Sequence, residues 1–410
     1  MLNRRVVVTG IGAITAIGSS WTEAQPRLES GRNAVVYMDS WDYEGLYTRL
    51  AAPVTDFPGL PHLSRKRTRT MGRVSLMAVA ATEQALRQAG LDGAEFLGSG
   101  SVGVAYGSST GSTDAAMDFI RMLLDRKVDG ITATTYIRMM SHTAPVNIAV
   151  HFGLTGRVIT SSSACTSGSQ AIGYAYETIR SGRQLAMIAG GGEELCPTEA
   201  AVFDTLYATS TRNEAPETTP RPFDKDRDGL VIGEGACTFL LEDLDHAKAR
   251  GADILAEVIG FGTNCDGAHV TRPNRITMGR CMELALADAG LPPTAIGYVN
   301  AHGTATEHGD IAESHATSEL FGANIPISSL KSYLGHSLGA CGAIEAWLTI
   351  EMMNHGWFAQ TANLENVDPR CGELDYIQGQ GRRITTDCVM SNNFAFGGIN
   401  TSLVFGRYPV

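Results

Sequence analysis

Three short polar segments carry side chains that could perform nucleophilic or acid–base chemistry. Cys165 lies in SSSACTSGSQ, between an apolar run that starts at Val158 and a stretch of small, helix-forming residues. His302 lies in VNAHGTAT and His336 in LKSYLGHSLGA, and each of these segments contains glycine and borders an apolar element. A cysteine and two histidines in such loops predict one shared site if the fold brings the loops together.

The position of Cys165 also predicts how its thiol would be activated. A helix that begins near this residue would place the thiol at the positive end of the helix dipole, beside free backbone N–H groups. Such surroundings lower the pKa of a thiol and favour the nucleophilic thiolate, and the same N–H groups could stabilise an oxyanion. The alternative is an inert buried cysteine, with each histidine in a structural role.

Other reactive patterns are incomplete. The Gly-Ile-Gly of residues 10–12 follows a predicted strand as in a dinucleotide-binding fingerprint, but Thr15 stands where the third small residue should be. There is no phosphate-binding G-x-x-x-x-G-K-[ST] loop and no G-x-S-x-G turn. His302, His308 and Asp310 do not have the spacing of a zinc site. We therefore expect no bound metal and no nucleotide cofactor.

Composition limits the class of protein. The 410 residues are 43% hydrophobic, enough for a large core, and the net charge of -11 disfavours nucleic acid as a partner. The eight cysteines include no C-x-x-C pair, which favours a reducing compartment. The first 21 residues resemble a signal peptide, but their glycines and threonines fit a strand and a turn better. With no apolar run suited to spanning a bilayer, we expect a cytoplasmic protein.

A basic segment stands out against this acidic background. SRKRTRTMGR, at residues 64–73, places five basic side chains at the start of a helical pattern. Such a run usually marks a solvated helix start. In an acidic protein it could also steer an acidic macromolecule to one place.

The order of predicted elements favours an α/β fold. Short β-branched runs alternate with helical stretches rich in alanine and leucine, as in proteins with buried sheets. We predict a division near residue 250, into halves 1–250 and 251–410, because each half offers a strand, a reactive-looking polar turn and a helix of small residues. Residues 213–228 contain three prolines and predict a long surface loop.

Taken together, the motifs resemble those of the β-ketoacyl-acyl carrier protein synthases of types I and II, which are thiolase-fold condensing enzymes. The resemblance covers nearly the whole chain, and its motifs occur in the family's order. They are VVVTGIGAITAIG, SSACTSG, GGGEE, RPFDKDRDGLVIGEGA, NAHGTAT, LKSYLGHSLGACGAIEA and SNNFAFGGINTSLVF.

The resemblance implies a duplicated, five-layered αβαβα fold and roles for individual residues. It makes Cys165 the acyl-accepting nucleophile and His302 and His336 its catalytic partners. The remaining implied roles are electrostatic support by Lys331, membership of the same buried polar network for Glu345, binding of the phosphopantetheine arm by Thr304 and Thr306, gating by Phe396, and docking of the acidic carrier protein by Arg65, Lys66 and Arg69.

The implied reaction is a decarboxylative Claisen condensation. An acyl chain moves from a carrier protein's phosphopantetheine to Cys165, and malonyl-carrier protein then loses carbon dioxide to form the attacking carbanion. The enzyme would need no cofactor of its own, because the substrate carries the phosphopantetheine. The family also implies a dimer, either of two identical chains or with a chain-length-factor-like homologue.

Some residues depart from the family pattern and leave alternatives open. Leu230 replaces a common phenylalanine near the malonyl pocket, and Asn393 and Ala395 replace serine and glycine, which we expect to alter the gating loop. These changes would suit a specialised polyketide or polyene pathway rather than housekeeping fatty-acid elongation, and both pathways stay open. A coenzyme A-dependent thiolase is disfavoured because SNNFAFGGIN lacks a second cysteine. A non-catalytic chain-length factor is disfavoured by Cys165 and both histidines.

Overall fold

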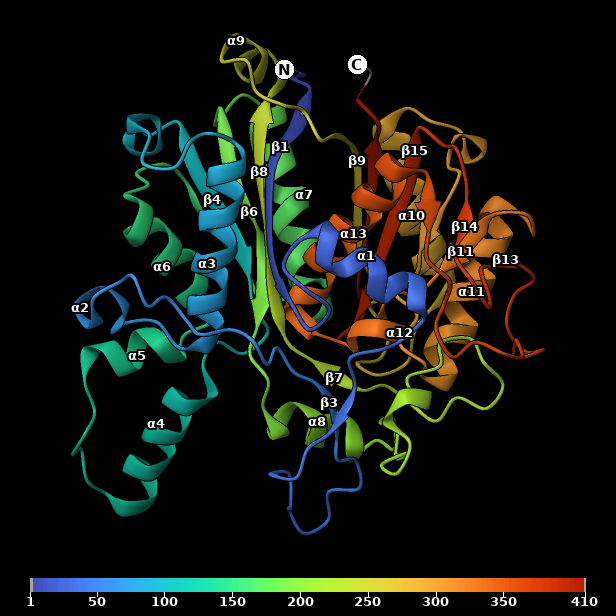
Figure 1. The fold of residues 1–410 in the computed structure, drawn as a ribbon, viewed down its shortest axis with the longest axis horizontal. Helices are drawn as coiled ribbons and strands as arrows, with labels where there is room; N and C mark the ends of the chain where they lie inside the picture. Colours follow the sequence, from blue (N-terminus) through green and yellow to red (C-terminus); the bar gives the residue numbers. More distant parts are fainter. Residues whose placement is uncertain (1–2, 409–410) are drawn as a thin grey trace.

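A mixed eleven-stranded sheet forms the centre of the computed structural model, which describes residues 3–408 (Figure 1). One side of the sheet is built from the strands that precede residue 250 and the other from the strands that follow it. In spatial order these are β5 (Val158–Ser161), β4 (Val102–Gly107), β6 (Ala186–Glu193), β8 (Gly235–Asp243) and β1 (Val6–Thr15), then β9 (Ala256–Cys265), β16 (Ile399–Gly406), β15 (Cys388–Ala395), β10 (Val299–Asn300), β11 (Pro326–Ser328) and β13 (Asp375–Tyr376).

The two sides repeat the same pairing pattern. β4 runs parallel to β5 and β6, while β8 runs antiparallel to β6 and β1. In the same way β10 runs parallel to β11 and β15, while β16 runs antiparallel to β15 and β9. The two sides join where residues 6–8 of β1 pair with β9. The fold is therefore duplicated, in agreement with the sequence prediction.

Helices cover both outer faces and fill the space between the two sides of the sheet. Figure 1 shows these layers edge-on, with α3 and α6 at the left, α7 and α13 in the middle, and α10 and α11 at the right. This order of layers is the predicted αβαβα arrangement. The helices are α3 (Arg73–Gln88), α6 (Thr143–Phe152), α7 (Ser167–Arg180), α13 (Cys341–His355), α10 (Arg275–Ala289) and α11 (Glu307–Phe321).

Each helical layer has its own hydrophobic core. The middle core includes Ile172 of α7 and Trp347 of α13, packed against the inner faces of both sides of the sheet. One outer core includes Met77 of α3, and the other includes Met282 of α10. Burial of these three apolar faces holds the layers together, and the chemistry is left to the loops at the strand ends.

Close contact between strand and helix explains the Gly-Ile-Gly motif near the start of the chain. A Cβ on Gly12 of β1 would lie 2.0 Å from the carbonyl oxygen of Ala81 in α3. In the other half, a Cβ on Gly262 of β9 would lie 2.2 Å from the carbonyl oxygen of Cys281 in α10. Both glycines let a helix backbone approach its strand. The motif is thus a packing feature.

Shorter helices and strands lie outside the main layers. They include a small three-stranded sheet and a two-stranded pair, joined by loops to the main layers. Their bounds are β2 (Val36–Tyr37), β3 (Leu50–Ala52), β7 (Ile232–Gly233), β12 (Trp357–Phe358), β14 (Arg382–Arg383), α1 (Trp21–Ser30), α2 (Arg65–Thr68), α4 (Thr113–Asp125), α5 (Ala133–Met139), α8 (Pro197–Asp204), α9 (Leu244–Ala249) and α12 (Lys331–Leu334).

The prediction of a surface loop at residues 213–228 was wrong for its middle part. Residues 219–224 are all buried, with Thr219, Phe223 and Asp224 fully shielded from solvent. Asp224 accepts hydrogen bonds from the backbone N–H groups of Glu365 and Asn366, at 2.8 and 2.9 Å. The proline-containing segment is therefore held against the second half of the fold by these hydrogen bonds.

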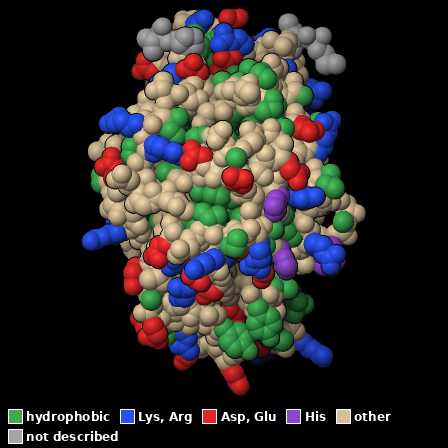
Figure 2. Space-filling model, turned by 90° about the vertical axis from the view of Figure 1, so that its right-hand side faces the viewer, with side chains coloured by type: hydrophobic (Ala, Val, Ile, Leu, Met, Phe, Trp, Pro, Cys, Tyr) green, Lys and Arg blue, Asp and Glu red, His purple; other side chains and the backbone are tan. Residues whose placement is uncertain are grey.

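The surface on the side of α10 and α11 has no broad patch of one charge. Figure 2 shows acidic and basic side chains interspersed over this face, with hydrophobic side chains gathered at its lower end. Segments at that end, around β3 and α8, carry the exposed apolar residues Tyr43, Tyr47, Val202, Leu206 and Tyr207. Across residues 3–408, no helix combines the length and apolar character needed to cross a membrane.

Candidate active site

Cys165 lies in a tight turn between β5 and α7. Ala164, just before it, has a φ of +50°, a region that residues other than glycine rarely adopt. A single 3-10 turn over residues 164–166 then leads into α7. Cys165 is 3% exposed, and its side chain is directed into a cavity of about 470 Å³. The turn thus presents the thiol at the bottom of a cavity, close to the start of a helix.

Burial reverses the predicted shift of the Cys165 pKa. Loss of hydration raises the pKa of this thiol to about 11, because the charged thiolate is disfavoured away from water. The backbone N–H groups of Phe396 and Cys165 and the charge of Lys331 act in the opposite direction, but they are outweighed. The resting group is therefore a thiol, and it needs a base before it can attack.

His336 is in position to be that base. Its Nε2 lies 3.0 Å from the Cys165 Sγ, and its backbone N–H donates to the Val231 carbonyl oxygen at 2.7 Å. Burial, followed by the charge of Lys331, holds the pKa of His336 well below its usual range. A neutral imidazole can accept the thiol proton, whereas an imidazolium could not.

His302 completes the group that the sequence predicted. Its ring centroid lies 5.2 Å from that of His336, with the two planes nearly perpendicular. Burial, the charge of Lys331 and the proximity of His336 hold the pKa of His302 well below its usual range. The structure therefore brings together two neutral imidazoles and a thiol, from loops more than 30 residues apart.

Glu313, which sequence reasoning missed, fixes the His302 loop. Its two carboxylate oxygens accept the backbone N–H groups of His302 and Gly303, each at 2.7 Å. Glu313 lies on α11 and is 1% exposed. A single acidic residue in a helix gives no signal in the sequence that it binds a loop eleven residues earlier.

Lys331 and Glu345 form a buried ion pair behind the histidines. Lys331 Nζ lies 2.5 Å from Glu345 Oε1, and each side chain is 2% exposed. Asn393 donates from Nδ2 to Glu345 Oε2 at 2.7 Å. Lys331 thus supplies the positive charge that depresses both histidine pKa values, while Glu345 compensates that charge.

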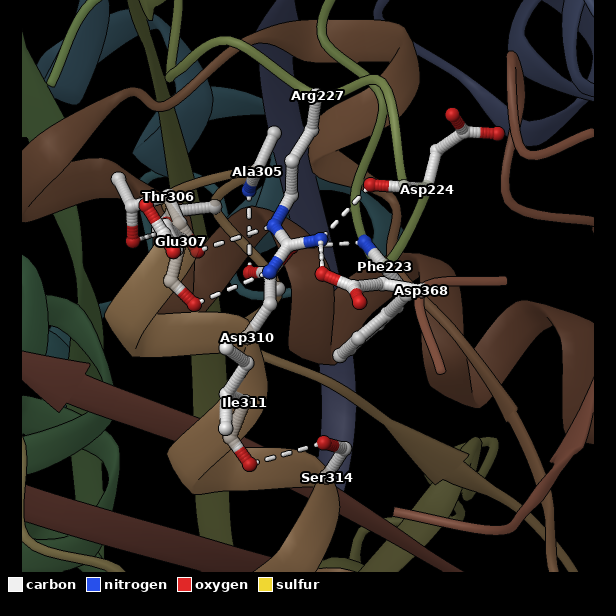
Figure 3. Close-up of polar contacts among 12 residues, drawn as sticks. Phe223, Asp224, Arg227, Ala305, Thr306, Glu307, Asp310, Ile311, Ser314 and Asp368 are labelled. Atoms are coloured by element: carbon white, nitrogen blue, oxygen red, sulfur yellow. Dashed lines mark hydrogen bonds and ion pairs between the residues drawn. The ribbon is translucent and has the colours of Figure 1, made fainter. Parts of the chain in front are cut away.

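A second ion network holds the 301–306 loop from the other side. Arg227 lies 3.4 Å from the Asp310 carboxylate and 2.7 Å from that of Asp368, and all three side chains are buried. Figure 3 shows the Arg227 guanidinium between these groups, with the backbone of residues 223–224 and 305–307 around it. Asp310 also accepts the backbone N–H groups of Phe223, at 2.7 Å, and Ala305, at 3.2 Å. The buried 219–224 segment therefore supports the site.

The remaining predicted residues line the mouth of the cavity. The Thr304 and Thr306 hydroxyl oxygens lie 2.9 Å apart, on either side of Ala305, whose φ is +66°. Phe396 is 37% exposed and packs edge-on against Phe203, with ring centroids 5.8 Å apart. The two hydroxyl groups and the aromatic ring lie along the path from solvent to Cys165.

The departures from the family pattern lie close to the nucleophile. Leu230 is 2% exposed, lines the cavity and belongs to the same apolar cluster as Cys165 and Leu338. Asn393 was expected to alter the gating loop, but it lies inside β15 and binds Glu345. Ala395 is the last residue of β15, next to Phe396. Asn393 therefore belongs to the buried ion pair.

The three basic residues predicted to contact a carrier protein are exposed on and beside α2. Within residues 3–408, Arg65, Lys66 and Arg69 form no ion pair with an acidic side chain. Their neighbour Arg67 anchors the segment by donating to the His151 carbonyl oxygen of α6 at 3.0 Å. Arg73, at the start of α3, is paired with Glu234 at 2.8 Å and does not belong to the free patch.

Cys165, His302 and His336 are also a chemically competent metal-binding set. The ligand atoms of Cys165, His302 and His336 lie within 4.8 Å of one another. Thiolate and imidazole are the ligands that zinc prefers. A zinc ion held there would occupy the nucleophile and both imidazoles, so that binding would compete with catalysis.

Family models match both halves of the chain. Residues 3–247 match the β-ketoacyl synthase N-terminal domain, and residues 255–365 match the β-ketoacyl synthase C-terminal domain. The chain belongs to the β-ketoacyl synthase family. This family is one of acyl-transferring condensing enzymes, so the predicted enzyme class and thiolase-like fold are confirmed.

Individual relatives of this β-ketoacyl synthase agree over its full length. It is 39% identical to the 3-oxoacyl-[acyl-carrier-protein] synthase 2 of Synechocystis, over 99% of this chain and 98% of that protein. A crystal structure of a β-ketoacyl synthase from Burkholderia phymatum is 58% identical, with a TM-score of 0.98 over 99% and 100% of the two chains. A ketosynthase of a type II polyketide system, solved with its acyl-carrier protein and a bound hexaketide, is 31% identical, with a TM-score of 0.88 over 99% and 100%.

Proposed function

We propose that this synthase catalyses decarboxylative Claisen condensation of malonyl-carrier protein with an acyl chain held as a thioester on Cys165. The observation that carries this proposal is the buried group of one thiol and two neutral imidazoles. His336 Nε2 is 3.0 Å from the Cys165 Sγ, and His302 lies beside it in the same cavity. This group can both accept an acyl chain and stabilise an enolate.

The first half-reaction transfers the acyl chain to the enzyme. The Cys165 thiol gives its proton to His336, and the sulfur attacks the thioester carbonyl of the acyl-carrier protein. The backbone N–H groups of Cys165 and Phe396, which face the sulfur, stabilise the oxyanion. The carrier's pantetheine sulfur leaves and takes up the proton, so the acyl chain remains on Cys165.

The second half-reaction forms the carbon–carbon bond. The malonyl carboxylate leaves as carbon dioxide, and its electron pair moves into the thioester to form an enolate. The two neutral imidazoles donate hydrogen bonds to the enolate oxygen, and the carbanion attacks the Cys165 thioester. The carbon–sulfur bond then breaks, and the released thiolate takes up a proton from solvent. Loss of carbon dioxide drives this step, and we propose that it uses no metal and no nucleotide.

Decarboxylation separates the roles of the histidines and the cysteine. We expect Cys165→Ala to lose condensation but to keep decarboxylating malonyl-carrier protein, because the imidazoles remain. His302→Ala should slow decarboxylation by about 10²- to 10³-fold, the usual cost of removing one oxyanion donor. Release of labelled carbon dioxide measures both. Equal loss in the two variants would remove the separate role given to His302.

The exposed basic side chains of α2 support a carrier-protein docking site. Acyl carrier proteins are acidic, and Arg65, Lys66 and Arg69 form no ion pair with the acidic side chains of residues 3–408. We expect the double variant Arg65→Glu/Lys66→Glu to raise KM for the carrier about tenfold or more at low salt, with kcat unchanged. Lys248→Glu, an exposed reversal on α9, is the matched control. An unchanged KM would place the docking surface elsewhere.

A dimer in the cytoplasm is the assembly that we propose. Exposed apolar residues on α4 and α5 and at the edge strand β5 support an interface, including Ile120, Leu124, Tyr136 and Val158. All eight cysteines are free, which fits a reducing compartment. Mass measurement of the purified chain, alone and with a chain-length-factor homologue, separates a homodimer from a heterodimer.

The pathway in which this synthase acts can be assigned from its products. Both fatty-acid and type II polyketide or polyene synthesis use this reaction, and Leu230 lines the cavity that holds the reacting groups. Product analysis with acyl-carrier proteins from the two kinds of pathway would assign the enzyme. Condensation with only one of the two sets identifies its role.

A further inference from the structure

A buried carboxyl group on α8 has no part in the mechanism above. Glu199 is 5% exposed, and within residues 3–408 its Oε2 has no hydrogen-bond partner. The contacts that remain are weak: the Thr110 hydroxyl lies 3.5 Å from Oε1, and the backbone of Cys196, at the start of α8, also interacts with the carboxyl group. Burying a carboxyl group without partners is unfavourable, so such a group points to a ligand that supplies the missing contact.

A neighbouring acid, Glu193, has the hydrogen-bond donors that Glu199 lacks. Glu193 accepts the backbone N–H groups of Ser109 and Gly339, at 2.8 and 2.9 Å, and a hydroxyl from Ser108 at 3.1 Å. Burial raises the pKa of Glu193 as well, but these donors act against that rise by favouring its charged form. Burial, followed by the proximity of Glu193, raises the pKa of Glu199 well above its usual range. A protonated Glu199 has both a hydrogen to donate and an oxygen to accept.

The position of Glu199 relates it to the nucleophile. Glu199 and Phe203 lie four residues apart on α8 and therefore share one helix face. Phe203 lines the catalytic cavity together with Cys165, and the intervening Ala200 belongs to the apolar cluster around Cys165. The Glu199 carboxyl is thus about one helical turn from the cavity wall, on an element that borders the acyl-accepting sulfur.

Thr110, whose hydroxyl contacts Glu199, lies in the loop after β4. β4 pairs with β5, the strand that leads to Cys165. Thr110 follows β4, whose last residue, Gly107, pairs with Ser161 at the end of β5. Cys165 comes four residues after Ser161. α8 and the loop after β4 therefore meet beside the Cys165 turn, and Glu199 lies between them.

We propose that Glu199 forms the polar end of the space that receives the acyl chain of Cys165, and that it favours chains with a hydrogen-bonding oxygen near their far end. This inference rests on the proposed function, because it requires an acyl thioester on Cys165. A hydroxyl group on the chain would accept the carboxyl hydrogen and donate to the carbonyl oxygen. A saturated chain would leave both groups buried without a partner.

Paired substrates test this preference directly. Carrier proteins are loaded with acyl chains of four to twelve carbons, each with and without a terminal hydroxyl group, and the rate of Cys165 acylation is followed by intact-protein mass spectrometry. For the wild type, we expect the hydroxylated member to react about tenfold faster at the length that reaches Glu199. Glu199→Ala should lose this preference and accept saturated chains better. The nearly isosteric Glu199→Gln should keep part of it.

The possible results separate the inference from the function on which it rests. Equal rates for both members of every pair in the wild type would overturn the role of Glu199 while leaving acylation of Cys165 established. A preference that persists in Glu199→Ala would overturn it as well. If no chain of any length reaches Cys165, the proposed function fails, and the inference fails with it. The wild-type comparison does not depend on the folding of a variant.

Discussion

The two halves of the molecule use the same turn for different purposes. In the first half, Ala164, with its positive φ, begins a single 3-10 turn that leads into α7, and this turn presents Cys165. In the second half, Leu338, with a φ of +43°, begins a single 3-10 turn that leads into α13. The residue that corresponds to Cys165 is Gly339, which has no side chain to react.

The two turns have different roles. The first presents a reactive side chain, and the second supports the structure around it. The Gly339 backbone N–H donates to the buried Glu193 at 2.9 Å, and a Cβ at this position would lie 2.7 Å from the same carboxylate. The second turn therefore braces the first half from across the middle layer. His336, two residues before Leu338, supplies the base that the buried thiol needs.

Exchanging side chains at the two corresponding positions should give opposite results. We expect Cys165→Ala to abolish acyl transfer and to leave the melting temperature nearly unchanged, because the smaller side chain removes only the sulfur. Gly339→Ala should instead destabilise the fold by about 1–3 kcal/mol through overpacking against Glu193. Acyl-transfer assays and thermal melts of both variants test this contrast. A Gly339→Ala protein as stable as the parent would show that the second turn is not a brace.

Thiol reactivity compares Cys165 with Cys265 of the second half. Cys265 is exposed, whereas burial raises the pKa of Cys165 to about 11. Below that pKa the thiolate fraction rises tenfold for each pH unit, so alkylation of Cys165 by iodoacetamide should increase about a thousandfold from pH 7 to 10. Peptide mass spectrometry follows each cysteine separately. A plateau near neutral pH would mean that the resting state is a thiolate–imidazolium pair, in conflict with the neutral histidines.

The two halves also stabilise their buried carboxylates in different ways. Glu193 in the first half is held by N–H and hydroxyl donors, whereas Glu345 in the second is compensated by Lys331. Lys331→Met should cost about 3–5 kcal/mol, because it leaves a buried carboxylate without its cation. The double variant Lys331→Met/Glu345→Gln should recover much of that loss. Chemical denaturation measures the parent, both single variants and the double variant, and additive losses would disprove the coupling.

Two further glycines test the packing that is shared by the two halves. Gly12→Ala and Gly262→Ala each place a Cβ within about 2 Å of a helix carbonyl oxygen. We expect similar destabilisation in the two variants, about 1–3 kcal/mol each. Gly130→Ala is a useful comparison, since no atom lies within 4 Å of the added Cβ, although its φ of +84° adds strain of its own. Unequal losses in Gly12→Ala and Gly262→Ala would show that one half tolerates relaxation better.

The sequence alone predicted the parts of the site that lie in recognisable loops. Cys165, His302 and His336 each occur in a polar, glycine-containing segment beside an apolar element, and the fold brings them together. The pKa of Cys165 could not be predicted, because the depth of burial outweighs the helix terminus and depends on the packing of distant layers. Glu313 was missed and Asn393 was assigned to the gating loop for a related reason, since the partners of both side chains are set by tertiary contact.

The duplicated architecture was easier to predict than the supporting segments. Local sequence patterns show the alternation of strands and helices. These patterns, together with the family resemblance, were enough to predict the α/β layers. The prolines of residues 213–228 suggested a surface loop, but Arg227 and Asp310 draw its neighbourhood into a buried ion network. Proline restricts the local backbone conformation, but it does not determine whether the segment is buried by other parts of the fold.

Acylation of Cys165 is the most direct test of the central proposal. The purified protein is incubated with an acyl-carrier protein in the absence of malonyl substrate, and the site of any mass increase is mapped by peptide mass spectrometry. We predict one acyl group per chain, on Cys165, with none on the exposed Cys265 and none in Cys165→Ala. An acyl group on another residue, or condensation that continues in Cys165→Ala, would contradict the proposal.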